Sequence, residues 1–164
     1  MIEIRRKFLD EDYCFEIILK SRKKVEPTKT SMGHMDTSVR NMSTMVYRDN
    51  NLKQKVLGIS DLSELEGITD NLYFQFAEYN EGQFFRWHDD GLEMKSHIIL
   101  LNNDFEGGEL EFKDNEDLNL GVGDCVTYYS KLKHRVKPVL SGVRYSLVAW
   151  EFPNDVWKKL MQTK

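Results

Sequence analysis

The chain has 164 residues, the length of a single domain that can bury its own hydrophobic core. With 40% hydrophobic and 30% charged residues, the composition is that of a globular protein, and no apolar run is long enough for a membrane helix. The net charge of −4 argues against a nucleic-acid partner, which requires a basic surface. We therefore expect one domain over residues 1–164, with no nucleic-acid or membrane partner.

The start of the chain, from Met1 to Lys7, alternates apolar and polar residues as a strand does, and it lacks the apolar stretch of a signal peptide. The two cysteines, Cys14 and Cys125, lie in apolar patterns and are expected to be reduced core residues. The sequence contains no internal repeat or obvious linker. We expect a cytoplasmic protein that acts as a monomer.

The N-terminal part, residues 1–70, is expected to support the rest of the domain with helices. A first helix is predicted over residues 10–20, with Asp10 as its N-cap. Its apolar face is expected to contain Phe15, Ile18 and Leu19. A second amphipathic helix is predicted over residues 51–66, with the apolar positions Leu52, Val56, Ile59 and Leu62.

Between these helices the sequence predicts a long mobile loop. Residues 26–38 contain Pro27 and Gly33, many serine and threonine residues, and few large apolar ones. Long loops in compact domains commonly cover or form binding sites, so this loop, extended to residue 50, is a candidate substrate lid. Its candidate hydrogen-bond partners for a bound peptide are Arg40, Asn41 and Tyr47.

From residue 72 onward the pattern changes to short strands separated by turn signals. The predicted strands are Leu72–Ala77, Phe84–Trp87, Ser96–Leu101, Gly108–Phe112, Asp124–Tyr129, His134–Val139 and Val143–Trp150, the last two flanking a Ser141-Gly142 turn. Regular spacing of this kind is typical of a sandwich, jelly roll or barrel. We predict a mostly β fold, a double-stranded β-helix (jelly roll) core over residues 72–152 with the N-terminal helices packed on one sheet.

The segment Trp87-His88-Asp89-Asp90 contains the first candidate metal ligands. Residues i and i+2 of a strand project to the same side, so His88 and Asp90 can point together into a barrel. An isolated His-x-Asp pair is a weak signal, but His134, at the start of a later strand, can supply a third ligand. Two histidines and one carboxylate form the facial triad of non-haem iron(II) oxygenases, which leaves three metal positions open.

Arg144 strengthens this interpretation. It lies on the strand that follows the one begun by His134, past the predicted Gly142 turn, and can therefore reach back into the barrel. A guanidinium group pairs with a carboxylate through two parallel hydrogen bonds. A keto diacid that chelates a metal at one end requires such a fixed cation at the other.

From Gln75 to Trp150 the chain resembles the prolyl 4-hydroxylase branch of the iron(II)/2-oxoglutarate-dependent dioxygenases. The matching segments are Phe74–Phe84, His88-Asp89-Asp90, Leu101–Phe112, Gly123-Asp124, His134–Val139 and Gly142–Trp150. They cover about half of the chain and include every metal and co-substrate position, whereas the N-terminal third is similar only in outline.

The resemblance implies a role for each matching residue. His88, Asp90 and His134 would bind Fe(II), and Arg144 would bind the distal carboxylate of 2-oxoglutarate. Tyr79 matches a tyrosine that hydrogen-bonds this carboxylate, whereas Leu110, Val136 and Trp150 match residues that line the co-substrate pocket or lie near the metal. Leu100 departs from the pattern, since many relatives have a tyrosine at this co-substrate contact, which puts the hydrogen bonding there in doubt.

The function implied is hydroxylation of a C–H bond with 2-oxoglutarate and O2 as co-substrates, and with succinate and CO2 as products. Ascorbate is the expected reductant. The resemblance favours C4 of a prolyl residue in a peptide or protein, while a free amino acid or another side chain stays an alternative. A binding module without catalysis and a metal-dependent barrel that does not use 2-oxoglutarate are the other two possibilities.

Several further polar residues are weighed against these candidates. Asp89 could replace Asp90 as a ligand, but adjacent residues of a strand face opposite sides. His34 lies in the predicted loop and His97 on the other face of its strand, so both are expected to be structural or exposed. Arg86, next to the metal strand, is expected on a solvated face.

Overall fold

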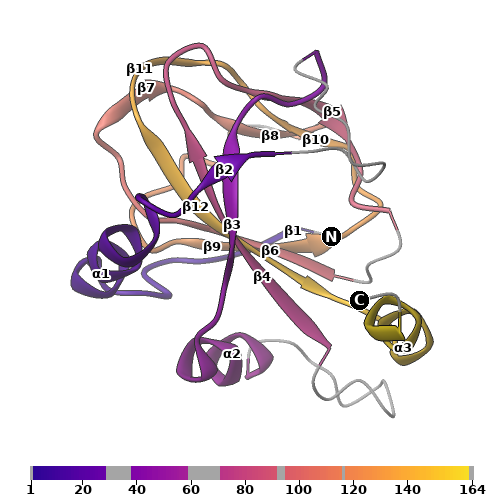
Figure 1. Cartoon of the computed structure of the whole chain (residues 1–164). Helices are drawn as coiled ribbons and strands as arrows, with labels where there is room; N and C mark the ends of the chain where they lie inside the picture. The colour runs from indigo at the N-terminus through magenta and orange to yellow at the C-terminus, as the bar shows by residue number, and fades with distance from the viewer. Residues whose placement is uncertain (1, 29–37, 59–70, 92–94, 116, 163–164) are drawn as a thin grey trace.

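The computed structural model describes residues 2–28, 38–58, 71–91, 95–115 and 117–162. Its centre is a seven-stranded sheet in the order β1-β9-β6-β12-β4-β3-β2, with all neighbours antiparallel (Figure 1). The strands of this large sheet are β1 (Ile2–Arg5), β2 (Glu26–Pro27), β3 (Ser43–Tyr47), β4 (Leu72–Tyr79), β6 (Lys95–Leu100), β9 (Cys125–Tyr129) and β12 (Arg144–Glu151).

Two smaller sheets lie over one face of the large sheet, at the top of Figure 1. One has the order β5-β10-β8 and the other pairs β11 with β7. Their strands are β5 (Phe85–His88), β7 (Phe105–Gly107), β8 (Leu110–Phe112), β10 (His134–Val136) and β11 (Val139–Gly142). This arrangement of facing antiparallel sheets confirms the predicted mostly β fold with a double-stranded β-helix core.

The large sheet separates two hydrophobic clusters because side chains of a strand alternate between its faces. On β4, Phe74 and Phe76 enter the cluster beneath the helices, whereas Ala77 and Tyr79 enter the cluster between the sheets. On β12, Leu147 belongs to the helix side in the same way. The interior between the sheets is therefore reached by every second residue of these strands.

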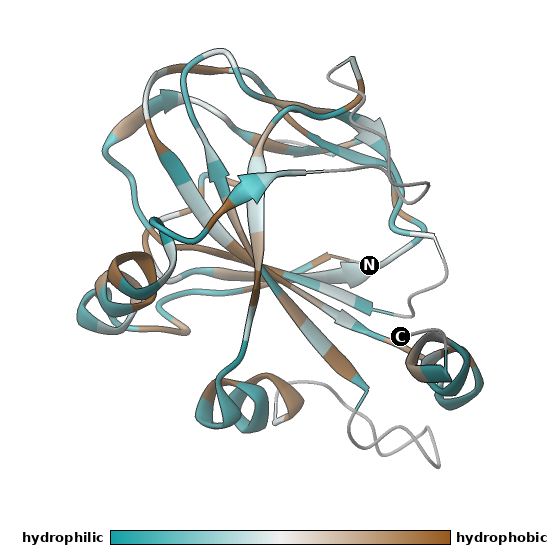
Figure 2. Cartoon of the chain, in the orientation of Figure 1, coloured by the Kyte–Doolittle hydropathy of each residue, from teal (hydrophilic) through white to brown (hydrophobic). Residues whose placement is uncertain are grey.

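Helices α1 (Glu11–Ser21) and α2 (Asn50–Leu57) pack on the outer face of the large sheet, as predicted. Asp10 caps α1 by accepting a hydrogen bond from the amide of Tyr13 at 2.7 Å. Figure 2 shows that each helix carries both apolar and hydrophilic residues. A third helix, α3 (Asn154–Gln162), was not predicted. No helix in the described part of the chain has the length and apolar character that a membrane crossing needs.

The predicted packing face of α1 was wrong in two of its three residues. Phe15 and Leu19 are 59% and 46% exposed, and only Ile18 is buried. The buried positions are Cys14, Ile17, Ile18 and Ser21. These follow the i, i+3, i+4, i+7 spacing of one helix face, and this face could be chosen only by counting the small residues Cys14 and Ser21 as core.

The predicted helix over 51–66 ends earlier, at Leu57, with Gly58 as its C-cap. Leu52 and Val56 are fully buried as expected, while Ile59 and Leu62 lie outside the described residues. The predicted loop over 26–50 was also wrong in part, because it contains β2 and β3. Strand β3 pairs with β4 along its whole length, so the segment belongs to the large sheet. Residues 29–37, which include His34, lie outside the description.

The predicted strand over 134–139 is divided into β10 and β11. Pro138 lies between them and lacks the amide hydrogen that a continuous ladder requires. Ser141 and Gly142, predicted as a turn, belong to β11, which pairs with the unpredicted strand β7.

Replacing Asp124 with alanine is expected to destabilise the fold by roughly 2–4 kcal/mol, because three hydrogen-bond donors lose a buried, charged acceptor. This side chain is 3% exposed and accepts hydrogen bonds from the amides of Lys7 and Gly121 and from Arg6. Burial alone would raise the pKa of Asp124, but these hydrogen bonds and the Arg6 charge lower it. Its stabilisation is therefore present above the ordinary aspartate pKa and is lost as the pH falls.

Urea unfolding at pH 7 and at pH 3 measures this effect. The exposed Asp117, which accepts one hydrogen bond from the amide of Asn119, provides the matched control Asp117→Ala. That control is expected to change stability by less than about 0.5 kcal/mol. Equal losses in the two variants would contradict the role of Asp124.

Candidate functional site

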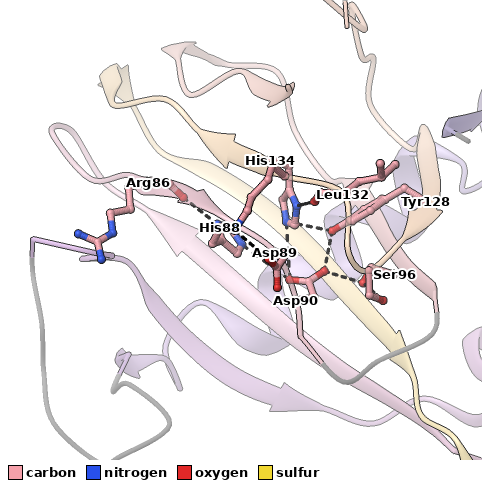
Figure 3. Close-up of polar contacts among 10 residues, drawn as sticks. Arg86, His88, Asp89, Asp90, Ser96, Tyr128, Leu132 and His134 are labelled. Atoms are coloured by element: carbon pink, nitrogen blue, oxygen red, sulfur yellow. Dashed lines mark hydrogen bonds and ion pairs between the residues drawn. The ribbon is translucent and has the colours of Figure 1, made fainter. Parts of the chain in front are cut away.

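His88, Asp90 and His134 lie together between the sheets. His88 ends β5, Asp90 follows two residues later, and His134 begins β10 directly opposite His88. Oδ1 of Asp90 lies 3.7 Å from Nε2 of His88 and 3.6 Å from Nε2 of His134. One ligand atom from each residue falls within 4.8 Å of the others, so the three could hold one metal ion. Figure 3 shows the side chains turned toward one another.

Both imidazole rings are fixed by the backbone. Nδ1 of His88 lies 2.7 Å from the carbonyl oxygen of Arg86, and Nδ1 of His134 lies 2.8 Å from that of Leu132 (Figure 3). A carbonyl oxygen only accepts hydrogen bonds, so each Nδ1 carries the hydrogen and each neutral ring keeps its Nε2 lone pair free. The sequence therefore places both Nε2 atoms toward Asp90 as metal ligands require.

The carboxylate of Asp90 is held by two hydroxyl groups. Tyr128 donates to its Oδ2 at 2.9 Å and Ser96 donates to the same atom at 2.5 Å, while Ser130 lies 2.9 Å from Ser96. The amide of Asp90 also donates to the carbonyl of Ser130 at 2.8 Å. These bonds occupy Oδ2 and leave Oδ1 facing the two histidines, an arrangement that orients a ligand and tunes its charge.

Sequence reasoning missed Tyr128, Ser96 and Ser130. Tyr128 and Ser96 are partners on the neighbouring strands β9 and β6, so their meeting beside Asp90 depends on the strand order. The available signal was the alternation on β9, which places Val126 and Tyr128 on the same inward face.

The protonation states suit metal binding. Burial and the neighbouring His134 lower the pKa of His88 to about 4, so its ring is neutral at physiological pH. Burial and the Asp90 charge raise the pKa of Tyr128 well above its ordinary value, so this phenol stays protonated and can donate to the carboxylate. Two imidazoles and one carboxylate are a donor set that Fe(II) accepts.

A cavity extends from the three candidate ligands to Arg144. Besides the ligands, the residues that line it include Tyr79, Tyr128, Val136, Arg144, Ser146 and Trp150. Arg144 and Tyr79 are opposite partners on β12 and β4, which places the guanidinium over the Tyr79 ring at 5.3 Å. The predicted residues Tyr79, Val136, Arg144 and Trp150 are therefore brought into one cavity with the triad.

Arg144 is a buried cation whose charge has no acidic partner within the described residues. It is 2% exposed, its Nη1 donates to Oγ of Ser146 at 3.0 Å, and its Nε has no hydrogen-bond partner in that part of the chain. Burial lowers the pKa of Arg144, as expected when a charge loses water. The hydroxyl of Tyr79 also makes no hydrogen bond to a described residue, and burial raises its pKa to about 12. These free donors create a place for an anion.

Leu100 and Leu110 do not line this cavity. They line a second cavity, which also contacts Arg144. Leu100 and Leu110 are the register partners of Ser146 and Val136, which line the first cavity, and their contact with the co-substrate stays a prediction.

The other weighed residues fall mainly where the pattern predicted. Asp89 is not part of the cluster of candidate ligands and pairs with Lys133 at 2.8 Å. Arg86 is exposed. His97 is fully buried on the other face of β6 and lies between Thr127 and Glu151, at 2.8 and 2.6 Å.

Of the three candidate peptide contacts, only Arg40 lines the cavity, where it lies over Phe85 at 5.4 Å. Oδ1 of Asn41 accepts a hydrogen bond from the amide of Phe84 at 2.8 Å. The prediction that Tyr47 contacts a peptide was wrong, because Tyr47 is buried beneath the helices and its hydroxyl donates to Asp49.

Comparison with known proteins agrees with this geometry. Residues 74–152 match the 2OG-Fe(II) oxygenase superfamily. A PKHD-type hydroxylase of Idiomarina loihiensis is 35% identical over 83 residues, 44% of this chain and 38% of the relative. A PKHD-type hydroxylase of Psychrobacter is 37% identical over 92 residues, 46% of this chain and 36% of the relative. The matched segments thus span little more than a third of these two relatives.

Solved structures resemble nearly the whole chain. A prolyl-4-hydroxylase of Pseudomonas putida superposes with a TM-score of 0.78 at 22% identity, covering 93% of this chain and 92% of that one. A Trichoplax adhaerens prolyl hydroxylase, solved with a hypoxia-inducible-factor peptide, gives a TM-score of 0.80 at 16% identity. The superposition covers 97% of this chain and 86% of that one. Residues 74–152 thus resemble the 2OG-Fe(II) oxygenase superfamily, and nearly the whole chain has the fold of these solved prolyl hydroxylases.

Proposed function

We propose that the protein is an iron(II)- and 2-oxoglutarate-dependent dioxygenase that hydroxylates a C–H bond and releases succinate and CO2. One observation carries the proposal: the His88, Asp90 and His134 cluster shares a cavity with Arg144, a buried cation without an acidic partner among the described residues. A metal site alone would not need this arginine. A keto diacid joins the two features, because its keto acid end chelates a metal and its distal carboxylate needs a cation.

The residues of the cavity fit both groups. Nε2 of His88, Oδ1 of Asp90 and Nε2 of His134 would hold Fe(II), which supplies the oxidising chemistry with O2 when it is bound. The guanidinium of Arg144 and the hydroxyls of Tyr79 and Ser146 would bind the distal carboxylate.

The cavity as it stands has a volume of about 40 Å³. This is room for a few water molecules rather than for a keto diacid. We therefore expect half-buried side chains of the lining, such as Arg40 and Gln75, to move when the co-substrate binds.

For the substrate we propose a prolyl residue in a peptide or protein, hydroxylated at C4. The support is the likeness to prolyl hydroxylases, one of which was solved with a peptide. The same chemistry on a free amino acid or on another side chain is the alternative. Ascorbate as reductant belongs to this proposal.

The test is succinate release by anaerobically iron-loaded protein that is given 2-oxoglutarate, oxygen and a panel of proline-containing peptides. Succinate that rises with one peptide, together with a gain of about 16 mass units on that peptide for one oxygen atom, supports both reaction and substrate. Succinate without any peptide effect keeps the dioxygenase and removes the prolyl substrate. No succinate from iron-loaded protein would favour a binding module.

Replacing Tyr128 with phenylalanine is expected to weaken metal binding by about 10-fold, because Asp90 loses a hydrogen bond that orients it. Equilibrium dialysis with Mn(II) measures the change without turnover. Tyr129→Phe is the matched control, since this neighbour is 49% exposed and should bind metal as the parent protein does. Equal affinity in Tyr128→Phe and the parent would remove Tyr128 from the metal site.

A further inference from the structure

A second cavity, of about 140 Å³, adjoins Arg144. Its apolar lining comes from Leu100, Phe105, Leu110, Leu118 and Leu120. Glu109, Asp117 and Asn119 supply polar groups to it. The two acidic residues make the second cavity a poor site for a free anion, whereas they suit a cation such as the guanidinium of Arg144.

The second cavity is lined by residues that neighbour, on paired strands, the residues lining the first cavity. Leu100 is the register partner of Ser146 on β6 and β12, and Leu110 is the partner of Val136 on β8 and β10. Ser146 and Val136 line the first cavity, whereas Leu100 and Leu110 line the second. Arg144 contacts both. Its side chain therefore forms part of the wall between the metal cavity and the free space behind it.

The side chain of Arg144 is closely packed along its stem but has few hydrogen bonds at its guanidinium group. The stem of Arg144 passes close to Gly108, where an added Cβ would lie 3.0 Å from its Cδ. The guanidinium is held by a single hydrogen bond, from Nη1 to Ser146, among the described residues, and its Nε lacks one. The guanidinium therefore borders free space and has few hydrogen bonds to break if it moves away from the metal ligands.

We propose that the co-substrate pocket accepts keto diacids longer than 2-oxoglutarate, because Arg144 can withdraw toward the second cavity. The proposal rests on the proposed function and names 2-oxoadipate, which has one more methylene group, as the probe. Leu100 sets this tolerance, since a larger side chain at that position would fill the space into which Arg144 moves.

Calorimetric titration of the anaerobic Mn(II)-loaded protein with each keto acid tests the proposal without turnover. If the pocket were closed behind Arg144, the extra methylene group would make 2-oxoadipate bind up to about 100-fold more weakly than 2-oxoglutarate. We expect instead that the dissociation constants of the two acids agree within about tenfold. The substitution Leu100→Phe should weaken the binding of 2-oxoadipate at least about tenfold more than the binding of 2-oxoglutarate. Leu118→Phe, which fills the same cavity from a loop, should give the same selectivity if Leu100→Phe does not fold.

Leu140→Phe is the control, because Leu140 is 67% exposed and outside both cavities. Binding of 2-oxoglutarate but not of 2-oxoadipate would overturn the proposal and leave the dioxygenase assignment intact. Equal binding of both acids by the parent and by the folded cavity variants would remove the second cavity from the explanation. Binding of neither acid would overturn the proposed function, and this inference with it.

Discussion

Asp90→Ala is expected to abolish succinate production and to weaken metal binding by more than about 100-fold, beyond the loss that outer-shell changes cause. Asp90 is the single carboxylate of the cluster and lies 3.6–3.7 Å from both histidine Nε2 atoms. Its removal also frees the hydroxyl of Tyr128, which lies 3.2 Å from Nε2 of His134 and can then occupy that ligand atom. Equilibrium dialysis with Mn(II) and a succinate assay measure the two effects.

The neighbouring residue provides a matched control. Asp89 lies outside the cluster and pairs with the half-exposed Lys133, so Asp89→Ala should keep metal binding and succinate release. Surface pairs of this kind contribute little to stability, so Asp89→Ala should remain folded, and circular dichroism checks the fold of both variants. Loss of metal in Asp89→Ala with retention in Asp90→Ala would reverse the assignment of the carboxylate ligand.

Arg144→Met is expected to weaken binding of 2-oxoglutarate by at least about 30-fold while Mn(II) binding is unchanged. The buried carboxylate would lose its charged partner, a change that costs about 2–5 kcal/mol in buried pairs. The same substitution should leave the free energy of unfolding unchanged or raise it, because the guanidinium is buried without an acidic partner among the described residues. A side chain kept at a cost to stability is a sign of function.

Calorimetry with the Mn(II)-loaded protein separates the two binding steps, and urea unfolding reports stability. Arg86→Gln is the control, since Arg86 is exposed and contributes its backbone carbonyl rather than its side chain to His88. An Arg144→Met protein that binds 2-oxoglutarate normally would favour a metal-dependent barrel that does not use the keto acid.

The ligand residues could be predicted because their pattern is local. The i, i+2 spacing of His88 and Asp90 and the strand starting at His134 require only the alternation of strands. Tyr128, Ser96 and Ser130 could not be found in this way, because they meet Asp90 through the pairing of β6 with β9 and through the tertiary contact of that sheet with the segment after β5.

The errors in the predicted fold also arise from contacts between residues far apart in the sequence or from small buried residues. Strand β3 was taken as part of a loop because its residues Ser43 to Tyr47 mix polar and apolar types, and its pairing with β4 is a long-range effect. The packing face of α1 was misplaced because it was chosen from large apolar residues, although the expected core residue Cys14 and the small Ser21 mark the buried side. That Leu100 and Leu110 line a second cavity beside Ser146 and Val136 could not be predicted either, because it requires the strand register.

The most direct test of the site is a crystal structure of the protein grown anaerobically with Mn(II) and 2-oxoglutarate, with anomalous diffraction at the manganese edge. The predicted result is an anomalous peak between Nε2 of His88, Oδ1 of Asp90 and Nε2 of His134, with the distal carboxylate of the keto acid on Arg144. A peak coordinated by other residues, or a keto acid whose distal carboxylate lies away from Arg144, would contradict the proposed dioxygenase site.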